Sequence, residues 1–131
     1  MLTNKQVVYT IQRCNDYAAQ SPTQLYMVGC MVLLSIKQSW HNIGHQLQDV
    51  YTHSSKSKYA FGFKSAGINY LDKHKEHLFA AMFTTNDDVE LMDIATSIPG
   101  MGLAKAGFFV QLVRGSASKR SGLNDWLYGR T

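Results

Sequence analysis

Apolar residues recur three or four positions apart along most of the chain, which is the spacing of one face of an α-helix. The first such segment runs from Thr3, a suitable N-cap, to about Ala19. The second begins at Ser21, with Pro22 at the first helical position, and continues to about Gln38. It is apolar on most of its sides, which predicts a central, buried helix.

The same spacing predicts further helices over residues 40–51, 66–83 and 103–114. Another short helix should follow "TTNDD" and end near Ser97, with Asn86 or Thr85 as its cap and acidic residues at the positive end of the helix dipole. Residues 52–67 show no sustained periodicity, and we expect them to form a loop.

No segment has a strong strand pattern, so the sequence predicts an all-α fold: a compact multi-helix domain that ends in two helices joined by a short turn. A chain of 131 residues fits one domain over 1–131. Residues 115–131 begin with Gly and Ser and are expected to form a basic, partly flexible tail.

Positive charge is concentrated near the C-terminus. The whole chain has 13 Lys and Arg, 9 Asp and Glu, and a formal net charge of +4. The last 27 residues contain one acidic residue, Asp125, and these basic residues: Lys105, Arg114, Lys119, Arg120 and Arg130. A clustered positive charge favours an anionic partner such as a nucleic acid, and the alternative is a solvated terminus.

The sequence has two cysteines, Cys14 and Cys30, and both lie in apolar helical patterns, so we expect buried free thiols. There is no signal-peptide pattern and no apolar stretch of about 20 residues, so we expect a soluble protein without a membrane partner, cytoplasmic or nucleoid-associated. The short length leaves open a fragment of a longer protein or a compact viral or mobile-element form.

The stretch "TSIPGMGLAKAGFF", residues 96–109, has the features of a phosphate-binding turn. Pro99 ends the preceding helix, and Gly100 and Gly102 allow positive φ or a close approach of the backbone. The helix that follows begins with unpaired amides and the positive end of its dipole, which together favour an anion. Lys105 lies in the first turn and adds charge.

These residues resemble the helix-hairpin-helix DNA-binding motif over about residues 86–114. The matching pattern is apolar, Pro, Gly, apolar, Gly and then a helix with small residues on its inner face: Ile98, Pro99, Gly100, Met101 and Gly102, followed by Ala104, Ala106 and Gly107. The resemblance implies contacts with the DNA backbone, largely without sequence preference. We expect the nucleic-acid-binding residues to be Pro99, Gly100, Met101, Gly102, Lys105, Arg114, Lys119 and Arg120.

The form of the motif is closest to the endonuclease III-type DNA glycosylases, which implies an enzymatic alternative. In lyase-competent members a catalytic lysine occupies the position of Ala104, and Lys105 is one residue late, which argues against lyase activity. The catalytic aspartate of that family is matched best by Asp125, which lacks the usual following residues. Such an enzyme also needs a base pocket, for which the candidates are Trp40 and Tyr59.

Simpler interpretations remain open for each feature. The glycine-containing turn is also compatible with an ordinary helix-helix connection in a structural or protein-interaction domain. The lysines and aromatic residues of the central loop form either a second nucleic-acid surface or a loop with a few core anchors: Lys56, Lys58, Tyr59, Phe61, Phe63 and Lys64. The histidine pairs, 41 with 45 and 74 with 77, have helical spacing but no accompanying zinc motif, so we expect no metal and no cofactor.

Overall fold

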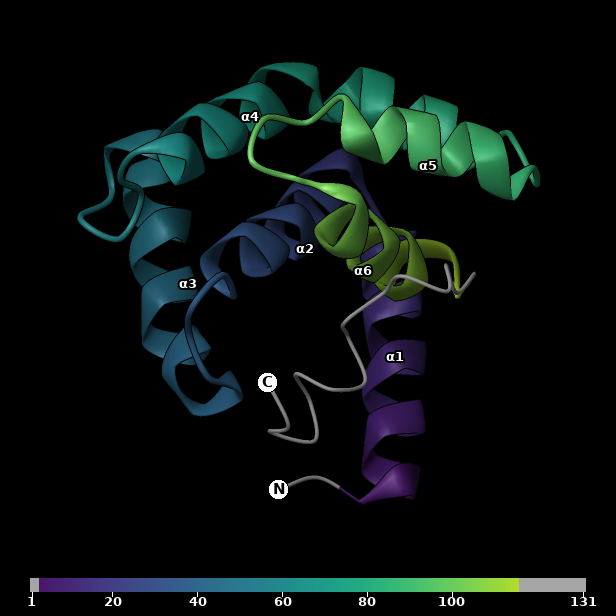
Figure 1. The fold of residues 1–131 in the computed structure, drawn as a ribbon, viewed down its shortest axis with the longest axis horizontal. Helices are drawn as coiled ribbons and strands as arrows, with labels where there is room; N and C mark the ends of the chain where they lie inside the picture. Colours follow the sequence, from purple (N-terminus) through teal and green to yellow (C-terminus); the bar gives the residue numbers. More distant parts are fainter. Residues whose placement is uncertain (1–2, 116–131) are drawn as a thin grey trace.

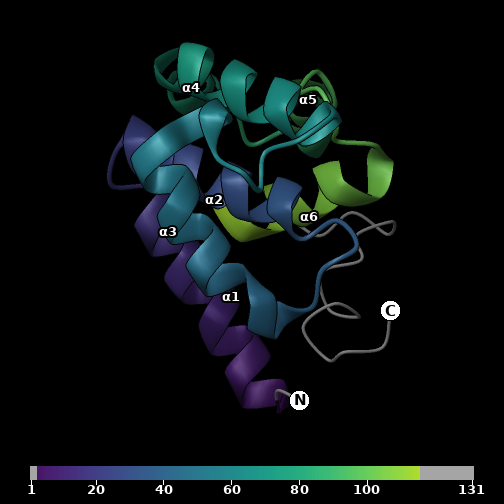
Figure 2. The same ribbon diagram turned by 90° about the vertical axis from the view of Figure 1, so that its left-hand side faces the viewer.

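The structure is a computed structural model that describes residues 3–115 of the chain, without the side chain of Trp40. Within that range it contains α-helices and two short 3-10 segments, and no strand, which confirms the predicted all-α fold (Figures 1 and 2). The helices are α1 (Asn4–Ala18), α2 (Pro22–Leu34), α3 (Ile43–His53), α4 (Phe63–Met82), α5 (Asp88–Thr96) and α6 (Leu103–Arg114), and the 3-10 segments are Trp40–Asn42 and Ser54–Lys56.

The first two helices begin where the capping residues predict. Thr3 caps α1, and its side chain and that of Gln6 form a reciprocal capping box. Ser21 caps α2, with Pro22 at the first helical position. However, α2 ends at Leu34, four residues earlier than the apolar pattern predicts. The backbone of Lys37 has a φ of 59°, which is incompatible with a continuing right-handed helix.

The helix α2 lies at the centre of the fold, as its nearly continuous apolar character predicts (Figure 1). It packs against α1, α3, α4 and α6. Three of its leucines, Leu25, Leu33 and Leu34, are completely buried, and they join Phe108 and Phe109 of α6 in the hydrophobic core. A helix that is buried on most sides must be covered by several neighbours, and this arrangement brings the starts of α4 and α6 to the C-terminal end of α2.

The region predicted to be a loop, residues 52–67, is shorter and more ordered than the sequence indicates. The helix α3 continues to His53, and α4 begins at Phe63 instead of Ala66. The intervening residues are held by side-chain hydrogen bonds, including one from the Ser57 hydroxyl to Asp49 and one from the Ser65 hydroxyl to the carbonyl of Ser55. Hydrogen bonds from serine hydroxyls therefore order this segment, although its sequence has no helical periodicity.

The helix α5 begins at a different cap from the two predicted. Asp87 is the N-cap and accepts a hydrogen bond from the amide of Val89, whereas Thr85 accepts one from the amide of Asp87. Leu91 and Ala95 form the buried face of α5, whereas Val89 is exposed.

The two cysteines are free thiols, with Cys30 buried and Cys14 half-buried. Burial raises the pKa of Cys14 to about 11 and that of Cys30 to about 12, so both thiols stay protonated at neutral pH. Over residues 3–115, no helix combines the length and the apolar character that crossing a membrane requires.

Candidate nucleic-acid interface

The turn between α5 and α6 has the geometry that its sequence demands. The amide of Met101 donates to the carbonyl of Ile98 over 3.1 Å, with Pro99 second in the turn and Gly100, at a φ of +89°, third. This is the residue pattern of a type II turn, in which the third position requires a positive φ. Ile98 and Met101 are buried, so these two apolar residues anchor the turn to the hydrophobic core.

The two glycines of the turn differ in what surrounds them. A Cβ on Gly100 would lie 3.1 Å from Cδ2 of Leu33 and 3.2 Å from Cδ2 of Phe63, so this glycine is enclosed by side chains of α2 and α4. A Cβ on Gly102 would have no atom within 4 Å. Gly100 is therefore required by the fold, whereas Gly102 faces open space at the surface.

The N-terminus of α6 is exposed and has no side-chain cap. Gly102 is the N-cap, and the first backbone hydrogen bond of the helix runs from the amide of Ala106 to the carbonyl of Gly102 over 2.8 Å. Leu103 is 50% exposed, and Ala104 is exposed instead of lining the inner face with Ala106. The first turn of α6 thus presents backbone amides and small or apolar side chains to the solvent.

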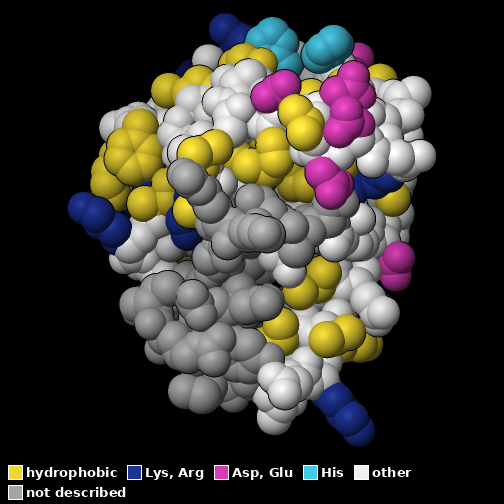
Figure 3. Space-filling model, turned by 45° about the vertical axis from the view of Figure 1, so that its right-hand side comes forward, with side chains coloured by type: hydrophobic (Ala, Val, Ile, Leu, Met, Phe, Trp, Pro, Cys, Tyr) yellow, Lys and Arg dark blue, Asp and Glu magenta, His cyan; other side chains and the backbone are white. Residues whose placement is uncertain are grey.

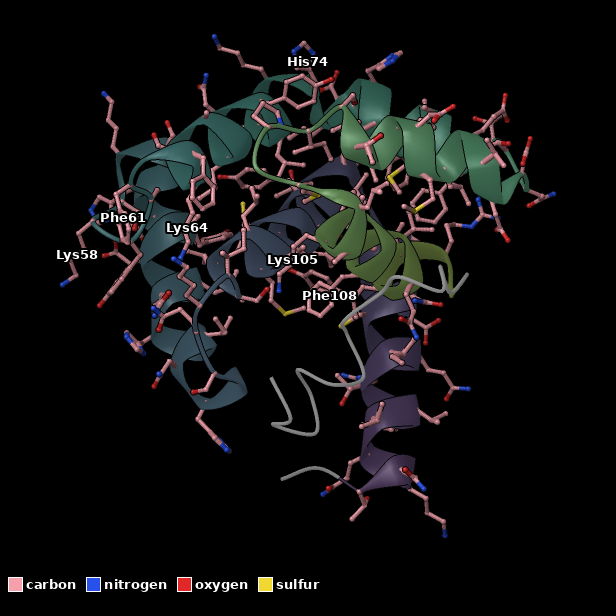
Figure 4. All side chains as sticks on the ribbon, in the orientation of Figure 1. Lys58, Phe61, Lys64, His74, Lys105 and Phe108 are labelled. Atoms are coloured by element: carbon pink, nitrogen blue, oxygen red, sulfur yellow. The ribbon has the colours of Figure 1, made fainter. Side chains whose placement is uncertain are left out.

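Lys105 points away from that exposed turn. Its amine donates to the hydroxyl of Ser35 over 3.1 Å and lies 4.8 Å from the centre of the Phe108 ring, above α2 (Figure 4). Lys105 is half-buried, whereas Lys64, at the start of α4, is buried and donates to the carbonyl of Ile36 over 3.1 Å. Both amines therefore approach the negative end of the α2 dipole. Burial lowers the pKa of each below the usual lysine range, and the charge of Lys64 lowers that of Lys105 further.

We expect Lys105→Met to raise the stability of the protein at neutral pH. The Ser35 hydroxyl keeps its hydrogen bond to the Val32 carbonyl, and the methionine leaves no desolvated amine. The folded-state pKa of Lys105 lies below its unfolded value, so wild-type stability rises as the pH increases from the folded to the unfolded pKa. The difference in stability between Lys105→Met and wild type therefore becomes smaller at alkaline pH. Urea denaturation at neutral pH and at about pH 9.5, with the exposed Lys5→Met as control, measures this. Equal stability of Lys105→Met and wild type at neutral pH would contradict it.

Arg114 lies at the other end of α6 and is engaged within the protein. Its guanidinium donates to the carbonyls of Met82 and Thr85 and to the side chain of Asn86, and it lies 5.7 Å from the ring of Phe83. It therefore provides hydrogen bonds for carbonyls at and after the end of α4 and holds the residues that precede α5. These three bonds use three of the five N–H donors of the guanidinium for contacts within the protein.

Three of the expected site residues, Lys119, Arg120 and Asp125, lie outside the described residues. The described surface around α5 is acidic, with these exposed carboxylates: Asp87, Asp88, Glu90 and Asp93. Figure 3 shows acidic side chains gathered toward one side of the surface, with hydrophobic side chains between them.

The central loop contributes residues whose position could not be read from the sequence. Phe61 and Phe63 are exposed, Lys58 extends into solvent, and Tyr59 packs edge-on against His45 with 5.3 Å between ring centres. Lys64 is an anchor and not a surface charge. The contact of Phe63 with Gly100 places this loop beside the turn, and no local pattern predicts a contact between residues 37 positions apart.

The histidines of the described chain are dispersed. His41, His45 and His77 are exposed, and His74 stacks on Tyr70 with 4.4 Å between ring centres, on the side of α4 that faces away from α2 (Figure 4). Among residues 3–115, no three His, Cys, Asp or Glu side chains come together as metal ligands would.

Comparison of the chain with protein-family models, with curated proteins and with solved structures finds no match. The function must therefore be argued from the geometry of the turn and its surroundings.

Proposed function

We propose that this protein binds the phosphate backbone of duplex DNA through the turn between α5 and α6, largely without sequence preference. The observation that carries the proposal is the exposed start of α6, where Gly102 leaves open space and no side chain occupies the first amides. Backbone amides at a helix start, reinforced by the helix dipole, hold a phosphate oxygen without reading a base.

The buried Lys64 and the half-buried Lys105 support this interface as sources of positive potential rather than as direct contacts. The amines of Lys64 and Lys105 lie near the starts of α4 and α6, and among the described residues neither is in a salt bridge. In the proposed complex, Lys119 and Arg120 add further charge from the tail. Arg114 positions α5 and α6 instead of contacting the phosphate.

The enzymatic alternative is a DNA glycosylase or a shortened relative, with Asp125 as the acid that stabilises charge at the sugar. It adds base release to the same backbone contact. A second alternative is a structural or interaction domain in which the turn only packs. Release of a damaged base from duplex DNA, compared between wild type and Asp125→Asn, separates the first alternative from simple binding.

We expect wild-type protein to bind fluorescein-labelled duplex DNA with an affinity that falls steeply as salt rises. If the turn and the tail neutralise about two to four phosphates, the plot of log K against log salt has a slope of roughly −2 to −4. Fluorescence anisotropy over a salt series, with two duplexes of unrelated sequence, measures the slope and the lack of sequence preference. An absence of binding at low salt would contradict the proposal and favour the interaction domain.

A further inference from the structure

Two aromatic side chains stand exposed beside the turn. Phe61 is 64% and Phe63 53% exposed, and they flank Gly62, whose φ of +59° marks a sharp change of chain direction. Single exposed apolar residues are ordinary on protein surfaces. A pair of phenyl rings at the bend that leads into a helix is a concentrated apolar surface, and it raises the question of what covers it.

The segment that carries these rings is held in place before any ligand arrives. Ser54 bonds to the hydroxyl of Tyr26 over 3.0 Å and to Asp72 over 3.2 Å. The Ser57 hydroxyl donates to Asp49 and accepts from the amide of Tyr59. Because the backbone is already fixed, a ligand that covers the rings pays little ordering entropy.

The rings are directly connected to the proposed phosphate site. Phe63 packs against the turn, since its Cδ2 lies 3.2 Å from the position that a Cβ on Gly100 would take. Gly100 and Gly102 are two residues apart, which limits their separation to about 7 Å. One strand of DNA that places a phosphate at the start of α6 therefore passes within reach of Phe63.

The charge beside the rings suits a phosphate strand. Lys58 is exposed and extends into solvent at the same end of α4 as Phe61 (Figure 4), so its charge can meet the strand. The amine of Lys64 lies 5.3 Å from the centre of the Phe61 ring but is buried, so it adds positive potential without contacting the strand. The nearby carboxylate of Asp49 is engaged by the Ser57 hydroxyl. Aromatic rings with interleaved cations are the surface on which unpaired bases stack, because every base offers a π-face while its phosphate meets the charge.

We propose that Phe61 and Phe63 form a stacking surface for an unpaired base of the DNA held by the turn, so that the protein prefers duplexes with an extrahelical or single-stranded nucleotide. This inference rests on the proposed function, because the turn supplies the backbone contact that brings the base to the rings.

We expect a duplex with one unpaired 2-aminopurine to bind wild-type protein roughly 5-fold or more tightly than the same duplex fully paired. Phe61→Ala should reduce this preference, while binding of the paired duplex and its salt slope stay as in wild type. Phe63→Ala should also reduce the ratio of the two affinities, which is the quantity to compare because Phe63 packs against the turn and its loss can weaken paired binding as well. Tyr51→Ala is the matched control, because Tyr51 is 69% exposed on α3 and should leave the preference unchanged. Anisotropy measures affinity, and 2-aminopurine fluorescence reports stacking directly.

The outcomes separate this inference from the proposed function. Salt-dependent binding with equal affinity for both duplexes would overturn the stacking surface and leave the backbone contact standing. A preference that survives both phenylalanine substitutions would overturn it as well. No binding of either duplex would remove both proposals, and capture of a protein partner that depends on Phe61 would then assign the rings to a protein interface. Circular dichroism of each variant confirms that it is folded.

Discussion

Gly102→Asp is expected to weaken the binding of duplex DNA at least about 10-fold, while the folded protein becomes slightly more stable. Gly102 has a φ of −73° and a ψ of −178°, an extended conformation that an N-cap aspartate adopts without strain. Its Cβ would enter open space. The new carboxylate accepts hydrogen bonds from the first amides of α6, which adds a few tenths of a kcal/mol. The same carboxylate occupies the proposed phosphate site and repels the phosphate.

The opposite signs of the two effects make the experiment decisive, since a loss of binding cannot be attributed to unfolding. Gly102→Ser caps the helix without a charge and should weaken binding less than Gly102→Asp. Gly44→Asp places the same charge in the first turn of α3, where Gly44 also faces open space, and should bind almost as wild type. Anisotropy and thermal denaturation are measured on all three variants. Wild-type affinity in a folded Gly102→Asp would show that the start of α6 is not the phosphate site.

Local features predicted the helices of this protein well because the determinants lie within a few residues. The caps at Thr3 and Ser21, the proline at the start of α2 and the Pro-Gly turn each act over one helical turn. The end of α2 and the start of α4 were misplaced for the same reason. They depend on serine hydroxyls and on Lys64 reaching the carbonyl of Ile36, which are contacts between elements.

The backbone of the turn could be predicted from the sequence, whereas the directions of the nearby basic side chains could not. The spacing of Pro99, Gly100 and Gly102 indicates the turn, and the turn is there. Lys105 and Arg114 were expected to contact DNA because of their charge. In the structure the amine of Lys105 donates to Ser35, and the guanidinium of Arg114 donates to the carbonyl of Met82 at the end of α4. A long basic side chain finds its partners through the tertiary fold, so its position in the sequence indicates its charge and not its direction.

Gly67→Ala is expected to be the most destabilising of the substitutions considered, with a net loss of about 1–3 kcal/mol in the free energy of unfolding. A Cβ at this position would lie 2.4 Å from the carbonyl oxygen of Pro99 and 2.6 Å from Cδ1 of Leu33. Alanine gains roughly 1 kcal/mol of helix propensity over glycine, but the oxygen belongs to the backbone of the turn and has no flexible end that can move aside. The helix α4 and the turn must therefore separate.

Gly44→Ala is the matched control, because it also replaces a helical glycine but meets no atom within 4 Å. It should raise the melting temperature through propensity alone, whereas Gly67→Ala should lower it by roughly 3–10 °C. Separation of α4 from the turn also moves Phe63 away from Gly100, so Gly67→Ala should lose the preference for an unpaired base before it loses binding of paired DNA. Equal stability of the two variants would show that α4 does not press against the turn in solution. The single contact between Gly67 and Pro99 thus links the stability of the fold to the placement of the aromatic rings beside the phosphate site.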